Sequence, residues 1–188
     1  MDPGLVSEHL SWSASGGAHF PDLLPLPLTE ESLDVVCRNV EVVQHRLGRR
    51  IVLENPSSYL RYRHSTIPEW DFIAAVAART GCGLLCDVNN IFVSACNHGF
   101  DALAYLRALP AQSIEEFHLA GHRVRTLDDG RSIRIDDHGS RVSVEVWALY
   151  AEAVALFGRR LTLIEWDTEV PALAVLLEEA AKADACAA

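Results

Sequence analysis

Histidine and carboxylate side chains recur at the ends of short apolar runs in this sequence. The stretch IEEFHL (residues 114–119) begins like a buried strand and finishes with His118. Other runs finish in the same way, with His9, Glu54, Asp87 and Glu165. Burying three carboxylates in one crevice is costly unless cations neutralise them. The pattern therefore predicts a metal site assembled from strand ends.

A second group of metal-competent side chains lies in the stretch IDDHG. Asp136 and His138 are two residues apart and would face the same side of an extended segment. Imidazole and carboxylate ligands without a thiolate favour iron, manganese or zinc over copper(I) or an iron–sulfur cluster. These side chains together are too many for one ion, so we expect two or three ions, with Glu54 or Asp87 as a bridging ligand.

The elements that must position these side chains alternate between strand-like and helix-like stretches. Continuous apolar runs predict strands over 5–10, 50–54, 83–88, 114–119 and 161–166. Amphipathic periodicity predicts helices over 30–47, 68–80, 143–157 and 171–184. This order is typical of βα units around a parallel sheet, the α/β class. In a parallel barrel all strand C-termini open on one face, where active sites are built.

Two further segments interrupt the βα order. The DDG turn within residues 123–142 predicts a β-hairpin inserted after the fourth strand. Residues 13–28 are interpreted as a long loop over the barrel mouth. No linker divides the chain, so residues 1–188 are expected to form one partial barrel domain. A complete barrel has eight units and about 250 residues, and the free edges of five units favour a homodimer.

Composition excludes several classes of function. The chain has 188 residues, 49% hydrophobic, and a net charge of −10. An acidic chain does not bind nucleic acid non-specifically, and no apolar run reaches the roughly 18–20 residues that span a membrane. The N-terminal stretch MDPGLVSEHL lacks the pattern of a signal peptide. Five cysteines without a CxxC pair indicate a reducing, cytoplasmic location, with Cys82 and Cys86 as core thiols.

Several motifs resemble one family closely. They are SEHLSWS, LLPLPLTEES, IVLENPSSYL, TGCGLLCDVNNIFVSACNHGFD, FHLAGH, IDDHG followed by VWALY, and TLIEWDTEVP. In order and spacing, from about residue 5 to residue 180, they resemble the multinuclear non-haem iron-dependent oxidative enzymes. The resemblance implies a TIM-barrel-like, xylose-isomerase-like fold, two or three iron ions, and dioxygen as co-substrate. It also implies oxidation of cysteine or other residues of a ribosomally synthesised precursor peptide, which a separate partner protein recruits.

The same resemblance implies roles for individual residues. Metal ligands would be His9, Glu54, Asp87, His118, Asp136, His138, Glu165 and one asparagine of DVNN, either Asn89 or Asn90. His122 and Asp167 would orient ligands, and His98 would contact substrate or stabilise the NHGFD loop. The family's chains are longer, and this one corresponds to their fourth to eighth barrel units. The first three units include a strand whose histidine helps bind one iron. Either the chain is shortened, with its activity impaired, or another chain supplies these units.

Two other functions fit the same ligands. A divalent-metal sugar isomerase or endonuclease-like barrel uses a similar ring of His, Glu and Asp. It would call for a catalytic lysine or a basic cluster near the ligands, whereas the only lysine is Lys182 in the last helix. A catalytically inactive metal-binding scaffold would keep the ligands and only bind a partner. Oxygen consumption with a cysteine-containing peptide separates that scaffold from an oxidase.

Overall fold

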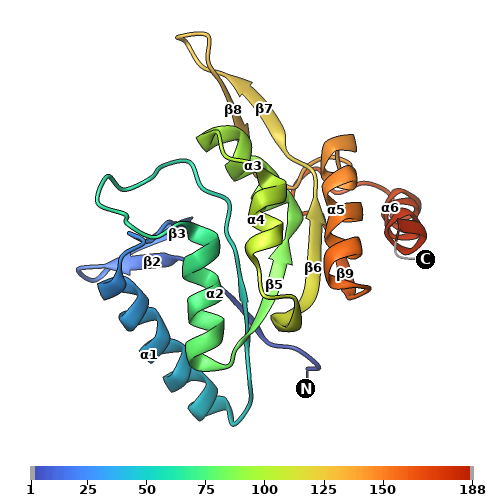
Figure 1. The fold of residues 1–188 in the computed structure, drawn as a ribbon. Helices are drawn as coiled ribbons and strands as arrows, with labels where there is room; N and C mark the ends of the chain where they lie inside the picture. Colours follow the sequence, from blue (N-terminus) through green and yellow to red (C-terminus); the bar gives the residue numbers. More distant parts are fainter. Residues whose placement is uncertain (1–2, 187–188) are drawn as a thin grey trace.

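The fold is an open α/β barrel built on a five-stranded parallel sheet (Figure 1). The computed structural model describes residues 3–186. The strand order is β1-β4-β5-β6-β9 and every pairing within it is parallel. The strands are β1 (Ser7–His9), β4 (Val52–Glu54), β5 (Gly83–Asp87), β6 (Ile114–Ala120) and β9 (Leu161–Glu165). The five predicted strands are therefore confirmed, with small changes at their ends.

Helices follow the strands along the chain and pack against the sheet (Figure 1). Phe72, Leu84, Phe117 and Tyr150 come from both layers and are almost completely buried, because the central strands are covered by helices. The helices are α1 (Glu30–Leu47), α2 (Glu69–Thr80), α3 (Val88–His98), α4 (Ala102–Ala108), α5 (Val144–Phe157) and α6 (Leu173–Cys186), with one 3₁₀ turn, η1 (Ala111–Ser113).

The ends of α1 follow signals that are local in sequence. The Thr29 side chain accepts from the backbone N–H of Ser32, and the Ser32 side chain accepts in turn from the backbone N–H of Thr29. Gly48 ends the helix with a φ of 62°, a conformation that costs glycine little. Because both signals lie within the segment itself, the predicted helix over 30–47 is confirmed at both ends.

Two predictions about local structure were wrong. Residues 13–28 are not simply a loop, because β2 (Trp12–Ser15) and β3 (Ala18–Leu24) pair there as a hairpin. Gly16 and Gly17 have φ values of 58° and 81°, which permit the tight turn between the two strands. The third strand also ends one residue earlier than expected, and α3 begins at Val88. The Asp87 side chain causes this change, since it caps α3 by accepting from the backbone N–H of Asn90.

The inserted hairpin is confirmed as β7 (Arg123–Thr126) paired with β8 (Ser132–Ile135). The strand ends at Ile135, so Asp136 and His138 lie in the following loop rather than in an extended strand. His138 has a φ of 45°, a left-handed conformation that is uncommon outside glycine. Such strained positions cluster at functional sites.

Both edges of the sheet leave apolar surface uncovered within residues 3–186. On β9, Leu161 and Leu163 are 66% and 46% exposed. On the apolar side of α1, Leu33, Cys37 and Val40 are buried, but Val43 and Leu47 are exposed. The barrel is thus open on the sides of β1 and β9. No helix in this part of the chain is long and apolar enough to cross a membrane.

Candidate metal centre

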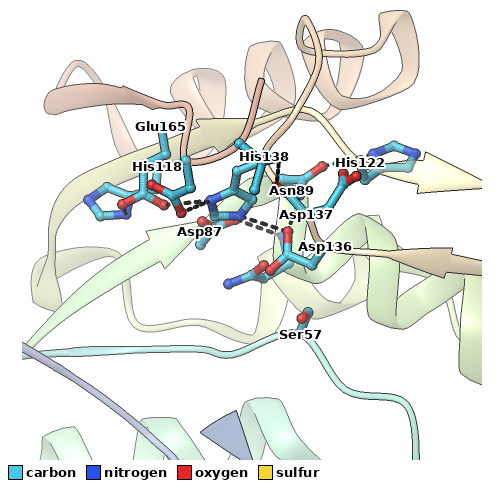
Figure 2. Close-up of polar contacts among 12 residues, drawn as sticks. Ser57, Asp87, Asn89, His118, His122, Asp136, Asp137, His138 and Glu165 are labelled. Atoms are coloured by element: carbon cyan, nitrogen blue, oxygen red, sulfur yellow. Dashed lines mark hydrogen bonds and ion pairs between the residues drawn. The ribbon is translucent and has the colours of Figure 1, made fainter. Parts of the chain in front are cut away.

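Four side chains converge at the C-terminal ends of four neighbouring strands, and Figure 2 labels three of them, Asp87, His118 and Glu165. One potential ligand atom from each lies within 4.8 Å of the others, and the residues are Glu54, Asp87, His118 and Glu165. The parallel register explains the convergence, because it pairs Asp87 directly with His118 across β5 and β6. Since parallel strands all run the same way, their last residues meet at one edge of the sheet.

Several polar atoms in this cluster are buried without a hydrogen-bond partner. They include Asp87 Oδ2 and His118 Nδ1. The His118 nitrogen lies 3.2 Å from Glu165 Oε1 and 3.5 Å from Glu54 Oε1 without a hydrogen bond to either. Buried polar atoms are nearly always hydrogen-bonded. Oxygen and nitrogen atoms that converge without such bonds fit the donor set of a bound cation.

The charges of the cluster also call for a cation. Burial raises the pKa of Asp87 well above its usual range, and the nearby carboxylates of Asp136 and Glu54 raise it further. Burial alone would lower the pKa of His118, but Glu165 and Glu54 outweigh it and raise that pKa to about 10. Burial would likewise raise the pKa of Glu165, yet His118 brings it below its usual value. Without a metal ion, the protonated imidazole of His118 therefore supplies the positive charge among these carboxylates.

A second cluster adjoins the first through Glu165. His138 Nδ1 lies 3.5 Å from Glu165 Oε2, on the opposite carboxylate oxygen from the one that faces His118. His138 Nε2 lies 2.8 Å from Asp136 Oδ1 and has no hydrogen-bond partner. Burial lowers the pKa of His138, but Asp136 and other carboxylates raise it to about 9. Glu165 therefore connects the two clusters, with one carboxylate oxygen toward each histidine.

The two asparagines of DVNN have different surroundings. The Asn89 amide is used at both ends: Nδ2 donates to Asp136 Oδ1 at 2.6 Å, and Oδ1 lies 2.9 Å from His122 Nδ1. The Asn90 carbonyl oxygen is buried without a partner, and the residue lines the cavity. The sequence left these two alternatives open, and the geometry favours Asn90 as a ligand, with Asn89 and His122 as positioning residues for Asp136.

The cavity at these strand ends has a volume of about 470 Å³. His9 enters it from the edge strand β1, with a 39% exposed side chain and Nε2 3.3 Å from Glu54 Oε2. Asp167 lines the cavity as well, and its Oδ2 lies 3.1 Å from His138 Nδ1. The other lining residues are Leu23, Glu54, Asn90, Asp136, Asp137, His138, Glu165 and Thr168.

His98 lies outside this cavity. It is the last residue of α3, rather than part of a loop, and its Nε2 lies 2.8 Å from Ser58 Oγ. His98 was predicted from the sequence to be a site residue, but the structure places it away from the histidines of the metal centre. Its contact ties the end of α3 to the segment that follows β4.

Sequence reasoning missed three residues that support the site. Asn55 makes two bonds of 3.0 Å to the backbone of Asp87, donating to its carbonyl and accepting from its N–H. The Tyr59 hydroxyl accepts from the backbone N–H of Asp136 at 2.9 Å. A side chain at Gly121 would collide with the backbone of Ser140, so glycine lets the two segments pack closely. The polar residues of LENPSSY and the glycine of HLAGH were the available signals.

Comparison with known proteins agrees with this geometry. The model of the family described as RiPP precursor modification enzyme MbnB/TglH/ChrH, where RiPP denotes a ribosomally synthesised and post-translationally modified peptide, matches residues 1–188. The chain belongs to this family. A UPF0276 protein of Vibrio vulnificus is 57% identical over 184 residues, which cover 98% of this chain and 63% of that protein. A UPF0276 protein of Caulobacter vibrioides is 51% identical over 179 residues, covering 95% and 63%.

Family membership and fold agree with each other. The chain spans less than two thirds of the length of these relatives. A xylose isomerase domain-containing protein from Salmonella typhimurium has a similar structure, with a TM-score of 0.55 and 15% identity. The likeness covers 87% of this chain and 61% of that one. It confirms the expected xylose-isomerase-like, TIM-barrel architecture, here with five of the parallel strands.

Proposed function

We propose that this chain provides the site of a multinuclear iron-dependent oxidase or oxygenase. Its substrate would be a ribosomally synthesised precursor peptide, modified at cysteine or another residue with dioxygen as co-substrate. The observation that carries the proposal is the cluster of Glu54, Asp87, His118 and Glu165, in which Asp87 Oδ2 and His118 Nδ1 are buried without a hydrogen-bond partner. Membership of the family of RiPP precursor modification enzymes supports the proposed substrate class.

Two or three iron ions would be held by the two adjoining clusters. One group of ligands is Glu54, Asp87 and His118, and a second is Asp136 and His138, with Glu165 between them. His9 and Asn90 would complete these sets from the cavity wall. The ligands are nitrogen and oxygen atoms without thiolate, a set that suits iron, manganese or zinc.

Bound iron would supply the redox change and would hold a cysteine sulfur as thiolate. The protein's own residues orient the ligands. Asn55 fixes the backbone at Asp87, Asn89 and His122 hold the Asp136 carboxylate, and Asp167 holds the ring of His138. Outer partners of this kind influence metal affinity about 10–100-fold.

Other parts of the proposal concern the whole protein. We propose that three further βα units close the barrel against the open edges at β1 and β9, from another chain or another part of a longer protein. A partner protein would recruit the peptide, and a second copy of this chain is an alternative occupant of the edges. The cysteines at 37, 82, 86, 96 and 186 are free, in keeping with the proposed cytoplasmic location.

Metal analysis tests the site directly. The purified chain is loaded with Fe(II) under anaerobic conditions, desalted and analysed for metals. We expect more than one iron per chain, with occupancy reduced by His118→Ala and unchanged by His45→Ala, which alters an exposed histidine on α1. Stoichiometric zinc with no gain on iron loading would count against the proposal.

The reaction is tested by mass. The chain is co-expressed with a polypeptide that supplies the remaining barrel units, a recruitment partner and a cysteine-bearing precursor peptide from the same genomic neighbourhood. We expect a changed peptide mass that requires His118. An unchanged mass despite a full iron complement, or equal conversion by His118→Ala, would refute the proposed chemistry.

A further inference from the structure

A second cavity, of about 360 Å³, lies next to the metal cavity and shares no lining residue with it. At the end of β1, His9 lines the metal cavity and the adjacent Leu10 lines the second one. At the end of β4, Glu54 lines the metal cavity and Pro56 lines the second one. The volume falls within the range of about 300–1,000 Å³ that is typical of ligand pockets. The two cavities are therefore lined by residues that are close in sequence at the ends of β1 and β4.

The walls of the second cavity are mostly apolar and rigid. Trp70 and Phe100 pack edge to face with ring centroids 5.7 Å apart, and Trp70 packs in the same way on the fully buried Tyr105. Prolines and aliphatic side chains, among them Leu26, Leu28, Ile67 and Pro68, add to the apolar lining. These walls fit an aliphatic or aromatic segment of a ligand.

One carboxylate lies against these apolar walls. Glu69, the first residue of α2, accepts a hydrogen bond from the Tyr105 hydroxyl at 2.9 Å through Oε1. Burial raises the pKa of Glu69 to about 7, although Tyr105 and Arg61 act to lower it. Within residues 3–186 no lysine, arginine or histidine is within ion-pair distance of this carboxylate. Glu69 is therefore an acid without an ion-pair partner in the described residues, and the charge of Arg61 acts on it only from a longer distance.

Neither His98 nor Arg61, the basic side chains that line the cavity, forms an ion pair with Glu69. His98 contacts Ser58 rather than Glu69. Burial lowers the pKa of His98, and the charge of Arg61 lowers it further, so the imidazole ring is neutral. Arg61 lines the cavity but is exposed, and it forms no ion pair in the described part of the chain. The cavity thus combines an acidic group against apolar walls with an arginine in contact with solvent.

We propose that this second cavity binds a side chain with an aliphatic stem and a cationic head, of the lysine type, from the precursor peptide. The stem would lie along Trp70 and Phe100, because long cationic side chains cover apolar and aromatic surface well. The ammonium group would pair with Glu69. A backbone carbonyl of the peptide would accept from the Arg61 guanidinium at the solvent side.

This placement would make the cavity a specificity pocket beside the metal centre, and in that respect it rests on the proposed function. Because the two cavities adjoin at the ends of β1 and β4, a peptide residue in the metal cavity has its neighbours close to the second pocket. The lysine pocket would select peptides that carry a basic residue near the modified one. It uses no metal ligand, so its binding can be measured without metal.

The test uses three small probes and the metal-free chain. N-acetyl-lysine, N-acetyl-norleucine and N-acetyl-glutamate, each as the N-methylamide, are titrated in separate NMR experiments at neutral pH. We expect the lysine probe to bind about tenfold more tightly than the norleucine probe, because a charge-assisted bond to Glu69 is added to the same apolar contact. The glutamate probe should bind most weakly.

A matched pair of variants links the preference to one residue. Glu69→Gln keeps an acceptor for the Tyr105 hydroxyl and should abolish the lysine preference, while Glu31→Gln, at an exposed first-turn glutamate of α1, should preserve it. Equal affinities for lysine and norleucine, a preference for glutamate, no binding of any probe, or a preference that survives Glu69→Gln would each overturn the inference. Iron content is measured separately, so failure of this pocket is distinguishable from failure of the metal centre.

Discussion

The change Glu54→Gln distinguishes a metal site from a structural ion-pair network. Glu54 is 4% exposed and lies between two imidazoles, with Oε2 3.3 Å from His9 Nε2 and Oε1 3.5 Å from His118 Nδ1. Glutamine keeps the size and one oxygen but removes the charge. We expect Fe(II) affinity to fall by at least about 100-fold, or about 2.7 kcal/mol, because loss of an outer partner alone costs about 10–100-fold.

The metal-free protein should respond far less to the same change. Removing the charge of the buried Glu54 relieves a desolvation cost of several kcal/mol, and charge interactions are taken at an effective dielectric constant of about 20. The attraction between Glu54 and protonated His118 at 3.5 Å is about 4–5 kcal/mol on the same scale. These opposing contributions nearly cancel, so the free energy of unfolding without metal should change by about 1 kcal/mol.

The assay has two measurements for each variant. A chromophoric chelator competes with the protein for Fe(II) under anaerobic conditions, and urea unfolding of the metal-free chain gives its stability. Glu152→Gln, at an exposed glutamate of α5, serves as the control and should change neither value. Unchanged iron affinity would refute the assignment of Glu54. A loss of about 3–5 kcal/mol in metal-free stability, as for a broken buried ion pair, would instead show that these carboxylates serve the fold.

Three other predictions concern protons, packing and the open sheet. The pKa values of His118 and His138 in the folded, metal-free protein are raised to about 10 and about 9, so both imidazoles are protonated at pH 7. Their contribution to the free energy of unfolding is therefore complete below about pH 6.5, the pKa of an unfolded histidine, and is lost as the pH rises through about 9 and 10. Because metal binding requires neutral imidazoles, calorimetry of Fe(II) binding in two buffers should detect proton release. The Fe(II) affinity should also increase from pH 6 to about 9. Binding without proton release would contradict this prediction. Gly121→Ala should lower the free energy of unfolding by about 1–3 kcal/mol in urea titrations, because the new Cβ meets the Ser140 backbone, whereas Gly4→Ala, with open space around it, should not. The exposed Leu163 of β9 should promote self-association, so light scattering should show less association for Leu163→Lys and no change for Leu156→Lys on α5; a compact, stable wild-type monomer would refute this.

The sequence alone determined the α/β class and the types of side chain at the site. Strand and helix signals are local: the cap formed by Thr29 and Ser32 and the glycine at 48 mark both ends of α1. Once the βα order is known, parallel strands must bring their last residues to one edge. That is why Glu54, Asp87 and His118 could be grouped before any contact was known.

Only the tertiary structure decided how the grouped residues divide their roles. Asp87 caps α3 at Asn90, which fixes where the helix begins, and each further residue turns by about 100° around its axis. The direction of each asparagine side chain therefore depends on the helix, and Asn89 contacts Asp136 from the loop that follows a distant hairpin. The adjacent cavity at Glu69 was also absent from the sequence pattern. Its walls come from four separate segments, and their distances are set by packing rather than by any local signal.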